Sequence, residues 1–194
     1  HHRVKNNMQV ISSLLDMSKS RAKHPETVDL LSEAQAKIFT MSLIHSQLYQ
    51  SDHFDEINMG RFIRRLVDHL SQMHCGDRNI HLKIQTADVH LSVTQAIPCG
   101  LAVNEIISNA YKHAFVGKKD GEIAISLQEK QGKKLHLNIR DNGVGIPDHV
   151  DIDNTKNLGI KLVRNLVLLQ LKGALQVNKS DGTEIDIEFR LIKS

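Results

Sequence analysis

A carboxylate, an amide and an ammonium group share one face of a predicted helix in the middle of the chain. Asn109 and Lys112 lie within about 40° of Glu105 on a helical wheel, and His113 lies at the edge of this stripe. Hard cations such as Mg²⁺ prefer oxygen ligands and keep some of their water molecules. The stripe could therefore hold a hydrated Mg²⁺ and phosphate groups. A solvated helix face would show the same residues, so the stripe alone leaves both interpretations open.

A second candidate site is the glycine-rich segment Asp141–Pro147, which directly follows a predicted strand. Gly143 and Gly145 are separated by one residue, and glycines allow unusual backbone angles and a close approach of ligand. The Asp141 carboxylate could accept a hydrogen bond from an exocyclic amine. An ordinary Asn-Gly turn remains the alternative. The two common nucleotide signatures, G-x-x-x-x-G-K-[ST] and G-x-G-x-x-G, are absent from the sequence.

The elements that would position these residues alternate between helices and strands in an irregular order. The hydrophobic periodicity predicts helices over 59–73, 94–115 and 158–171, and strands over 79–86, 123–128, 135–140, 174–178 and 184–191. Asn58 is a candidate cap for the first of these helices. Strict βαβ repetition is absent, so we expect an α+β fold: a two-layer sandwich with a mixed sheet rather than a Rossmann fold.

The first 50 residues have the pattern of two amphipathic helices, separated near Pro25. Their apolar residues recur every three or four positions: Val4, Met8, Ile11 and Leu15, then Leu31, Ala34, Ile38, Met41 and Leu48. An antiparallel hairpin of two helices cannot bury a core alone. A second copy is the economical partner and would complete a four-helix bundle. We therefore expect a hairpin domain over 1–56, a homodimer formed through residues 1–50, and a second domain over 57–194.

Composition excludes several classes of protein. The chain has 194 residues, a formal net charge of +3 and two cysteines. The charge is too small to indicate nucleic-acid binding, and two cysteines are too few for a disulfide scaffold and fit a reducing compartment. No apolar run approaches the roughly 20 residues of a membrane span. These features predict a cytoplasmic location and no membrane contact within this chain, and leave open whether a longer protein is membrane-anchored.

Taken in order, four segments resemble the ATP-binding domain shared by histidine kinases, DNA gyrase, MutL and the ninety-kilodalton heat-shock chaperone. Residues 104–115 resemble its asparagine box, 141–147 its first glycine box and 157–160 its second, and Gly182-Thr183 resembles its Gly-Thr element. The resemblance covers about residues 57–192. Four matches in the right order and spacing are far more specific than any one of them, and they imply that the chain binds ATP with Mg²⁺.

The resemblance also implies roles for individual residues. Asp141 would bind the adenine amine, with Thr183 near the same edge, and Asn109 would hold Mg²⁺. Glu105 would be the polar catalytic residue of the asparagine box. The remaining residues would face the phosphates or shape the pocket and its lid: Lys112, His113, Gly143, Gly145, Leu158 and Gly159.

The start of the chain, H-H-R-V-K-N-N-M-Q, resembles the phosphoacceptor box of sensor histidine kinases, in the subgroup whose acceptor histidine is followed by Arg. With Val4 at 0° on a helical wheel, His2 falls near 160°, opposite the apolar stripe, and His1 falls near 60° at its flank. The exposed position favours His2 as the acceptor, and the resemblance implies the same residue. Remnants of a purification tag are the alternative origin of the two histidines. Because Arg3 replaces the usual acidic residue, the general base is open: Glu105 or a later carboxylate could serve.

The implied function is ATP-dependent autophosphorylation of His2 and transfer of the phosphate to an aspartate on a response-regulator receiver domain. The receiver would dock on the hairpin. An anti-sigma-factor-type serine kinase is an alternative, but it lacks the hairpin. The gyrase, MutL and chaperone ATPases need a further domain downstream. A dimerisation scaffold or pseudokinase that binds ATP without transferring phosphate is the non-enzymatic alternative. Because the chain starts within the acceptor box, we expect a sensor region upstream.

Overall fold

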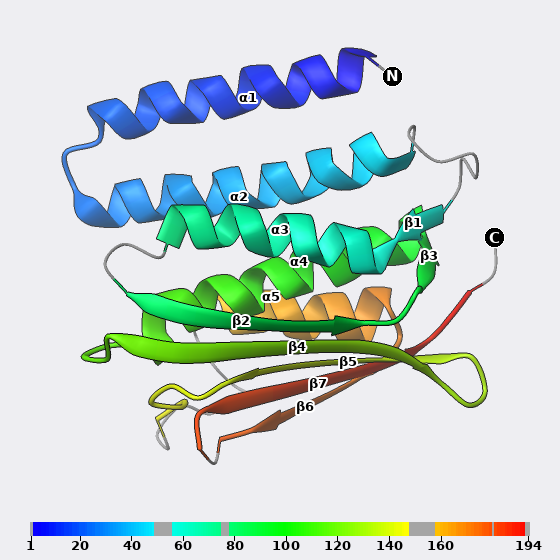
Figure 1. Ribbon diagram of the computed structural model, residues 1–194. Coiled ribbons are helices and arrows are strands. Elements are labelled where there is room, and N and C mark those ends of the chain that lie inside the picture. Colours follow the sequence, from blue (N-terminus) through cyan, green and yellow to red (C-terminus); the bar gives the residue numbers. More distant parts are fainter. Residues whose placement is uncertain (1, 49–55, 75–77, 148–157, 180, 193–194) are drawn as a thin grey trace.

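Three layers stack on one another in the computed structural model, which describes residues 2–48, 56–74, 78–147, 158–179 and 181–192. The helical hairpin forms the outer layer, the helices α3, α4 and α5 form the middle layer, and a twisted β-sheet forms the third (Figure 1). Helices α3 and α4 are therefore covered on both sides, by the hairpin and by the sheet.

The hairpin consists of α1 (His2–Arg21) and α2 (Pro25–Leu48). Pro25 is the first residue of α2, where its missing N–H costs no helical hydrogen bond. Helix α1 packs mainly on α2, whereas α2 also packs on α3 and α4. Consequently α2 has fully buried residues, among them Leu43 and Ile44, and none of the described side chains of α1 is buried.

A mixed five-stranded sheet has the strand order β2-β4-β5-β7-β6. Its strands are β2 (Asn79–Thr86), β4 (Asp120–Lys130), β5 (Lys134–Asp141), β6 (Ala174–Asn178) and β7 (Thr183–Arg190). Strand β2 runs parallel to β4, and every other neighbouring pair is antiparallel. The predicted α+β class with a mixed sheet is therefore confirmed.

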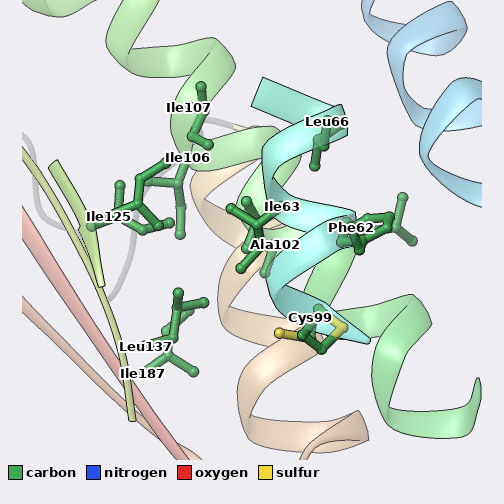
Figure 2. Close-up of a cluster of buried hydrophobic side chains, with 14 of the residues drawn as sticks. Phe62, Ile63, Leu66, Cys99, Ala102, Ile106, Ile107, Ile125, Leu137 and Ile187 are labelled. Carbon is green, nitrogen blue, oxygen red and sulfur yellow. The ribbon is translucent and has the colours of Figure 1, made fainter. Parts of the chain in front are cut away.

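The helical layer consists of α3 (Met59–His74), α4 (Val93–Asn109) and α5 (Leu158–Asn165). As predicted, Asn58 caps α3: its Oδ1 accepts a hydrogen bond from the Arg61 backbone N–H at 2.9 Å. Phe62 and Ile63 of α3, Cys99 and Ala102 of α4, and Ile125 of the sheet meet in one core (Figure 2). Alternating burial along β4 and β5 turns one face of the sheet toward these helices.

Three features differ from the sequence expectation. Two three-residue strands, β1 (Glu56–Asn58) and β3 (His90–Ser92), pair as a small antiparallel ribbon that is too short to show alternation in the sequence. The predicted helix over 94–115 changes at Ala110 into a π-helical turn, η1 (Ala110–Ala114). The helix over 158–171 likewise ends in a π-helical turn, η2 (Leu166–Gln170). Hydrophobic periodicity cannot separate an α-turn from a π-turn, because one turn is too short to change the pattern.

Candidate active site

A cavity of about 180 Å³ lies between the helical layer and the sheet. Helices α4 and α5, the turn η1, strands β5, β6 and β7, and the glycine-rich loop after β5 contribute to its wall. The lining residues are Ile106, Asn109, Ala110, His113, Ala114, Ile139, Asp141, Gly145, Ile146, Pro147, Ile160, Val163, Leu175, Val177, Thr183 and Ile185. The wall is mainly aliphatic, with a few polar side chains, which is the usual composition of a site for a small organic ligand.

Asp141 is a buried carboxylate at the end of β5, next to Thr183 at the start of β7. Its Oδ1 accepts hydrogen bonds from the backbone N–H groups of Gly143, at 2.9 Å, and Thr183, at 3.2 Å. Burial raises the pKa of Asp141, and hydrogen bonds from Gly143 and Thr183 and the charge of Lys118 offset part of this shift. The carboxylate is thus held in one orientation in a largely apolar cavity.

Close backbone contacts explain two of the glycines around Asp141. A Cβ atom on Gly143 would lie 2.3 Å from the carbonyl oxygen of Ala114, and the Val144 N–H donates to the same oxygen at 2.8 Å. A Cβ atom on Gly182 would lie 2.1 Å from the carbonyl oxygen of Asp141, and Gly182 has a positive φ of 98°. The glycine-rich loop is therefore joined directly to η1, and the Gly182-Thr183 turn is joined to the end of β5.

Two polar side chains at the end of α4 and in the π-helical turn that follows line the cavity. Asn109 is the last residue of α4, and His113 belongs to η1, together with Ala110 and Ala114, which also line the cavity. Single π-turns inside helices are frequent at functional sites, because the extra residue changes the direction of the side chains that follow. Of the stripe predicted from the sequence, only Asn109 and His113 face the cavity.

The other two residues of that stripe lie beneath the hairpin. Glu105 has only 8% of its side chain exposed, and its Oε2 lies 3.1 Å from the Nζ atom of Lys37 on α2. Lys112 forms an ion pair with Glu33, also on α2. Sequence periodicity places all four residues on adjoining faces of one helix, but it cannot show that a second helix covers part of that surface.

The second glycine box begins α5, and only part of it is described. A Cβ atom on Gly159 would lie 2.1 Å from Oε1 of Glu105, so glycine lets α5 pass close to α4. Leu158 is 74% exposed and does not line the cavity, whereas Ile160 does. Residues 148–157, which include Asn157 of the second glycine box, lie outside the described residues.

The aliphatic lining was not predicted as part of the site. Ile139, Leu175, Val177 and Ile185 come from the alternating faces of β5, β6 and β7. Their alternation predicts only that they face inward. Only the tertiary arrangement shows that the helices leave a cavity above them.

The predicted acceptor residue lies far from this cavity. The side-chain amide of Gln35 on α2 donates hydrogen bonds to the Ser12 carbonyl oxygen and to the Asp16 carboxylate of α1. The neighbouring Glu33 and Lys37 of α2 form ion pairs with Lys112 and Glu105. Ser12 is therefore the part of α1 that lies above the end of α4. His2 begins α1, ten residues before Ser12, which is about 15 Å along a helix axis. Figure 1 shows the N-terminus at the opposite end of the molecule from the glycine-rich loop, drawn in yellow.

Two family models match the chain. Residues 1–74 match a model described as histidine kinase, and residues 94–193 match the model of histidine kinase-, DNA gyrase B- and HSP90-like ATPases. The chain therefore belongs to this ATPase family. The two matches together place it among the sensor histidine kinases, as the sequence motifs implied.

Relatives and solved structures agree with this placement. The sensor histidine kinase PdtaS of Mycobacterium tuberculosis is 27% identical over 193 residues, which cover 98% of this chain and 38% of the relative. Blue-light-activated histidine kinase 2 of Erythrobacter litoralis is 28% identical over 195 residues, covering 98% of this chain and 55% of the relative. This chain thus spans well under two thirds of either relative.

Among solved structures, the histidine kinase domain of the Erythrobacter litoralis blue-light activated histidine kinase superposes with a TM-score of 0.75. The identity is 23%, and the match covers 96% of this chain and 94% of that one. It shows that the two proteins share a fold that includes the hairpin. Separately, none of the helices in the described part of the chain is long and apolar enough to cross a membrane.

Proposed function

We propose that this chain is the catalytic core of a histidine kinase that phosphorylates itself on His2 and passes the phosphate to an aspartate of a response-regulator receiver domain. The observation that carries the proposal is the buried Asp141 carboxylate in an aliphatic cavity that also presents Asn109 and His113. That arrangement suits a nucleotide with a planar base and a charged phosphate tail.

The cavity suits ATP in particular. A carboxylate accepts a hydrogen bond from the amine of adenine and repels the oxygen at the same position of guanine. Asp141 would therefore select adenine, with Thr183 beside it, and the aliphatic side chains of Ile139 and Ile185 would contact the ring. The phosphates would extend toward Asn109 at the end of α4 and His113 on η1.

A magnesium ion would reach this site together with the nucleotide. Within the described part of the chain, no cluster of three or more His, Cys, Asp or Glu side chains could hold a metal. The Asn109 amide lines the cavity and offers one oxygen ligand. One protein oxygen fits an ion that takes its remaining ligands from phosphates and water. When bound, the ion would reduce the charge on the phosphates.

The transfer itself needs a neutral imidazole. An unperturbed histidine has a pKa near 6.5, so pH values above this favour the neutral form that the reaction needs. In the reaction a ring nitrogen of His2 bonds to the γ-phosphorus, and the bond from phosphorus to the bridging oxygen breaks as ADP leaves. The ring proton goes to a base, for which Glu105 is our candidate. Positioning contributes most of the remaining rate enhancement in such transfers.

His2 must come to the γ-phosphate, because in this arrangement the acceptor end of α1 lies far from the cavity. Either the ATP-binding half moves relative to its own hairpin, or a second copy presents its own His2. We propose residues 1–56 as the acceptor and dimerisation domain and residues 57–194 as the ATP-binding domain. The receiver would bind the hairpin, where the phosphorylated histidine lies.

The test is phosphotransfer from radiolabelled ATP. We expect wild type and His1→Ala to incorporate an acid-labile, base-stable label and His2→Ala to incorporate none. Label retained by His2→Ala and lost from His1→Ala would assign the acceptor to His1. Wild type that binds ATP without any labelling would support the non-enzymatic alternative, a scaffold or pseudokinase.

A further inference from the structure

Three arginine side chains share one exposed face of α3, within its first two turns. Arg61, Arg64 and Arg65 are all exposed, and residues three or four positions apart lie next to one another on a helix. Among the described residues, no acidic side chain forms an ion pair with any of the three. We call Arg61, Arg64 and Arg65 the arginine patch.

The arginine patch is electrostatically unfavourable for the protein alone. Aligned N–H groups give the first turn of a helix a partial positive charge, which favours anions there and disfavours cations. No acidic residue occurs in the first turn of α3, and like charges three or four residues apart repel each other. Folding alone would favour acidic or neutral residues at these positions, and local conflicts of this kind are expected at functional sites.

The arginine patch borders a hollow of about 310 Å³ between the start of α3 and the end of β2. Besides the three arginines, its lining consists of Asn58, Gly60, Thr86, Ala87 and Asp88. Asp88 is the only carboxylate in this lining, and its Oδ1 already accepts a hydrogen bond from the Asn58 amide at 2.6 Å. The lining therefore carries three positive charges against one negative charge, which favours an anionic partner.

The arginine patch lies at the same end of the molecule as His2. The Gln35 amide of α2 contacts the Ser12 carbonyl oxygen of α1. The two helices run in opposite directions, so ten residues back along α1 and ten residues forward along α2 bring His2 level with His45. Figure 1 shows the N-terminus at the same end of the stacked layers as β1, which leads into α3.

Gln47, two residues beyond His45, joins this end of the hairpin to the first turn of α3. In the orientation that satisfies both partners, its buried amide donates to the Asn58 carbonyl oxygen at 3.3 Å and accepts from the Phe62 N–H at 3.2 Å. Packed helix axes lie roughly 8–10 Å apart, so the two steps from α1 to α2 and from α2 to α3 span roughly 20 Å. A domain of about 100 residues has a radius of gyration of about 13 Å. One partner domain can therefore contact His2 and the arginine patch together.

We infer that the arginine patch binds the acidic face of the receiver domain that takes phosphate from His2. This inference rests on the proposed function. The receiver carries the acceptor aspartate, and metal ions in phosphoryl transfer are held by further carboxylates. Its phosphate-accepting face is therefore acidic. Arginine pairs with carboxylates through two parallel hydrogen bonds, and opposite charges also steer two proteins together before they touch.

The arginine patch takes no part in the bond exchange itself. In the transfer, the bond from phosphorus to the His2 nitrogen breaks as a carboxylate oxygen of the receiver bonds to phosphorus, and the freed ring nitrogen takes a proton from water. The arginines hold the receiver while this happens. Their loss should therefore weaken binding of the receiver and leave the chemical step unchanged.

Transfer kinetics test the inference, with the receiver domain of the same organism that this chain phosphorylates fastest. We expect Arg64→Gln/Arg65→Gln to raise the KM for the receiver by roughly 10-fold with kcat unchanged. Autophosphorylation from ATP should keep its wild-type rate. Added salt should raise the KM of wild type more than that of the variant, because it screens the lost charges.

Arg21→Gln/Lys23→Gln is the matched control. It removes two exposed positive charges at the other end of the hairpin, and it should change neither the KM nor autophosphorylation. Thermal unfolding without a partner adds a second measurement. We expect a higher Tm for Arg64→Gln/Arg65→Gln than for wild type, because repulsion within the patch is relieved. A lower Tm together with slower autophosphorylation would show that the arginines support the fold, and would overturn the inference.

The remaining outcomes separate this inference from the proposed function. An unchanged KM, or an equal rise in the control, would overturn the arginine patch as a docking surface while the proposed function stands. If the KM is unchanged and inorganic diphosphate binds wild type but not Arg64→Gln/Arg65→Gln in calorimetry at saturating ADP, the hollow takes a small anion instead. Failure of wild type to label His2 would refute the proposed function. Label on His2 that no receiver accepts would refute the receiver as the occupant.

Discussion

The hairpin helix α1 and the central helix α4 show how differently the two parts of this molecule are completed. Cys99, Ala102 and Val103 of α4 are fully buried between the other helices and the sheet. In α1, by contrast, Leu14 and Met17 are more than half exposed. The ATP-binding half is enclosed by its own sheet and by α2, whereas α1 presents apolar side chains that no other described part of the chain covers. The packing of the ATP-binding half can therefore be tested by substitutions within one chain, whereas the exposed face of α1 can be tested only by measuring association between chains.

The apolar surface of α1 is not the one that the sequence predicted. In the predicted stripe, Val4, Met8 and Leu15 are half-buried, whereas Ile11 is 45% exposed. A second face carries Val10, Leu14 and Met17, each between 53% and 59% exposed. Both faces obey helical spacing, so periodicity alone could not show which one α2 would cover.

If the ATP-binding half depends on close backbone contacts, Gly143→Ala should have the largest effect. Its Cβ atom would overlap the Ala114 carbonyl oxygen, a backbone atom that cannot move without opening the junction of the loop and η1. We expect ATP affinity to fall by more than about 100-fold, since the cavity wall would separate. Isothermal titration with ATP measures this.

Gly132→Ala is the matched control, because a Cβ atom at Gly132 would meet no other atom. Its positive φ of 79° makes the substitution cost about 1 kcal/mol of stability, but ATP affinity should stay unchanged. Normal ATP affinity in Gly143→Ala would show that the junction between the glycine-rich loop and η1 can shift without harming the cavity. The ATP-binding half would then not depend on this close backbone contact.

Asp141→Asn should have the next largest effect on ATP affinity, which should fall. The same substitution should raise the stability of the nucleotide-free protein. A hydrogen bond to a charged acceptor contributes roughly 1.5–3 kcal/mol, so ATP affinity should fall by about one to two powers of ten. Preference for ATP over GTP should fall as well. The Asn oxygen can still accept from Gly143 and Thr183, which both donate to a single oxygen of Asp141.

The stability effect follows from the raised pKa of Asp141. A carboxyl whose pKa is higher in the folded state favours folding at low pH, and this contribution is lost as pH rises through the folded pKa. At pH 7 the ionised group is therefore a cost that Asn lacks. We expect a higher Tm for nucleotide-free Asp141→Asn than for wild type at pH 7, with the difference shrinking as pH falls toward 4. A difference that grows on acidification would contradict the direction of the shift.

Sequence reasoning predicted most of this fold because its elements are long and regular. Strands β2 and β6 have their predicted bounds, and helix α3 extends one residue beyond its prediction. Asp141, Asn109 and Thr183, which the motifs and the family resemblance predicted as site residues, all line the cavity, and their individual roles stay predictions. What the sequence could not show depends on other segments. Glu105 meets Lys37 only because α2 crosses it, sixty-eight residues away in the chain.

The smallest effect expected is on pairing of the hairpin, and it concerns the face of α1 that the sequence did not predict. Leu14 is 56% exposed, so a second copy can cover about half of its side chain. Full burial of a leucine contributes about 1.5–3 kcal/mol, and Leu14→Ala should therefore weaken a symmetric dimer by roughly 1–2 kcal/mol, counted over both copies. That corresponds to a 5- to 30-fold rise in the dimer Kd, measured by sedimentation across a concentration series.

Ser13→Ala, one residue away on another exposed face, should leave the Kd unchanged. If wild type sediments as a monomer at every concentration, the exposed face of α1 has another partner and the four-helix bundle is wrong. If both variants pair as wild type does, the dimer uses a surface other than the one containing Leu14.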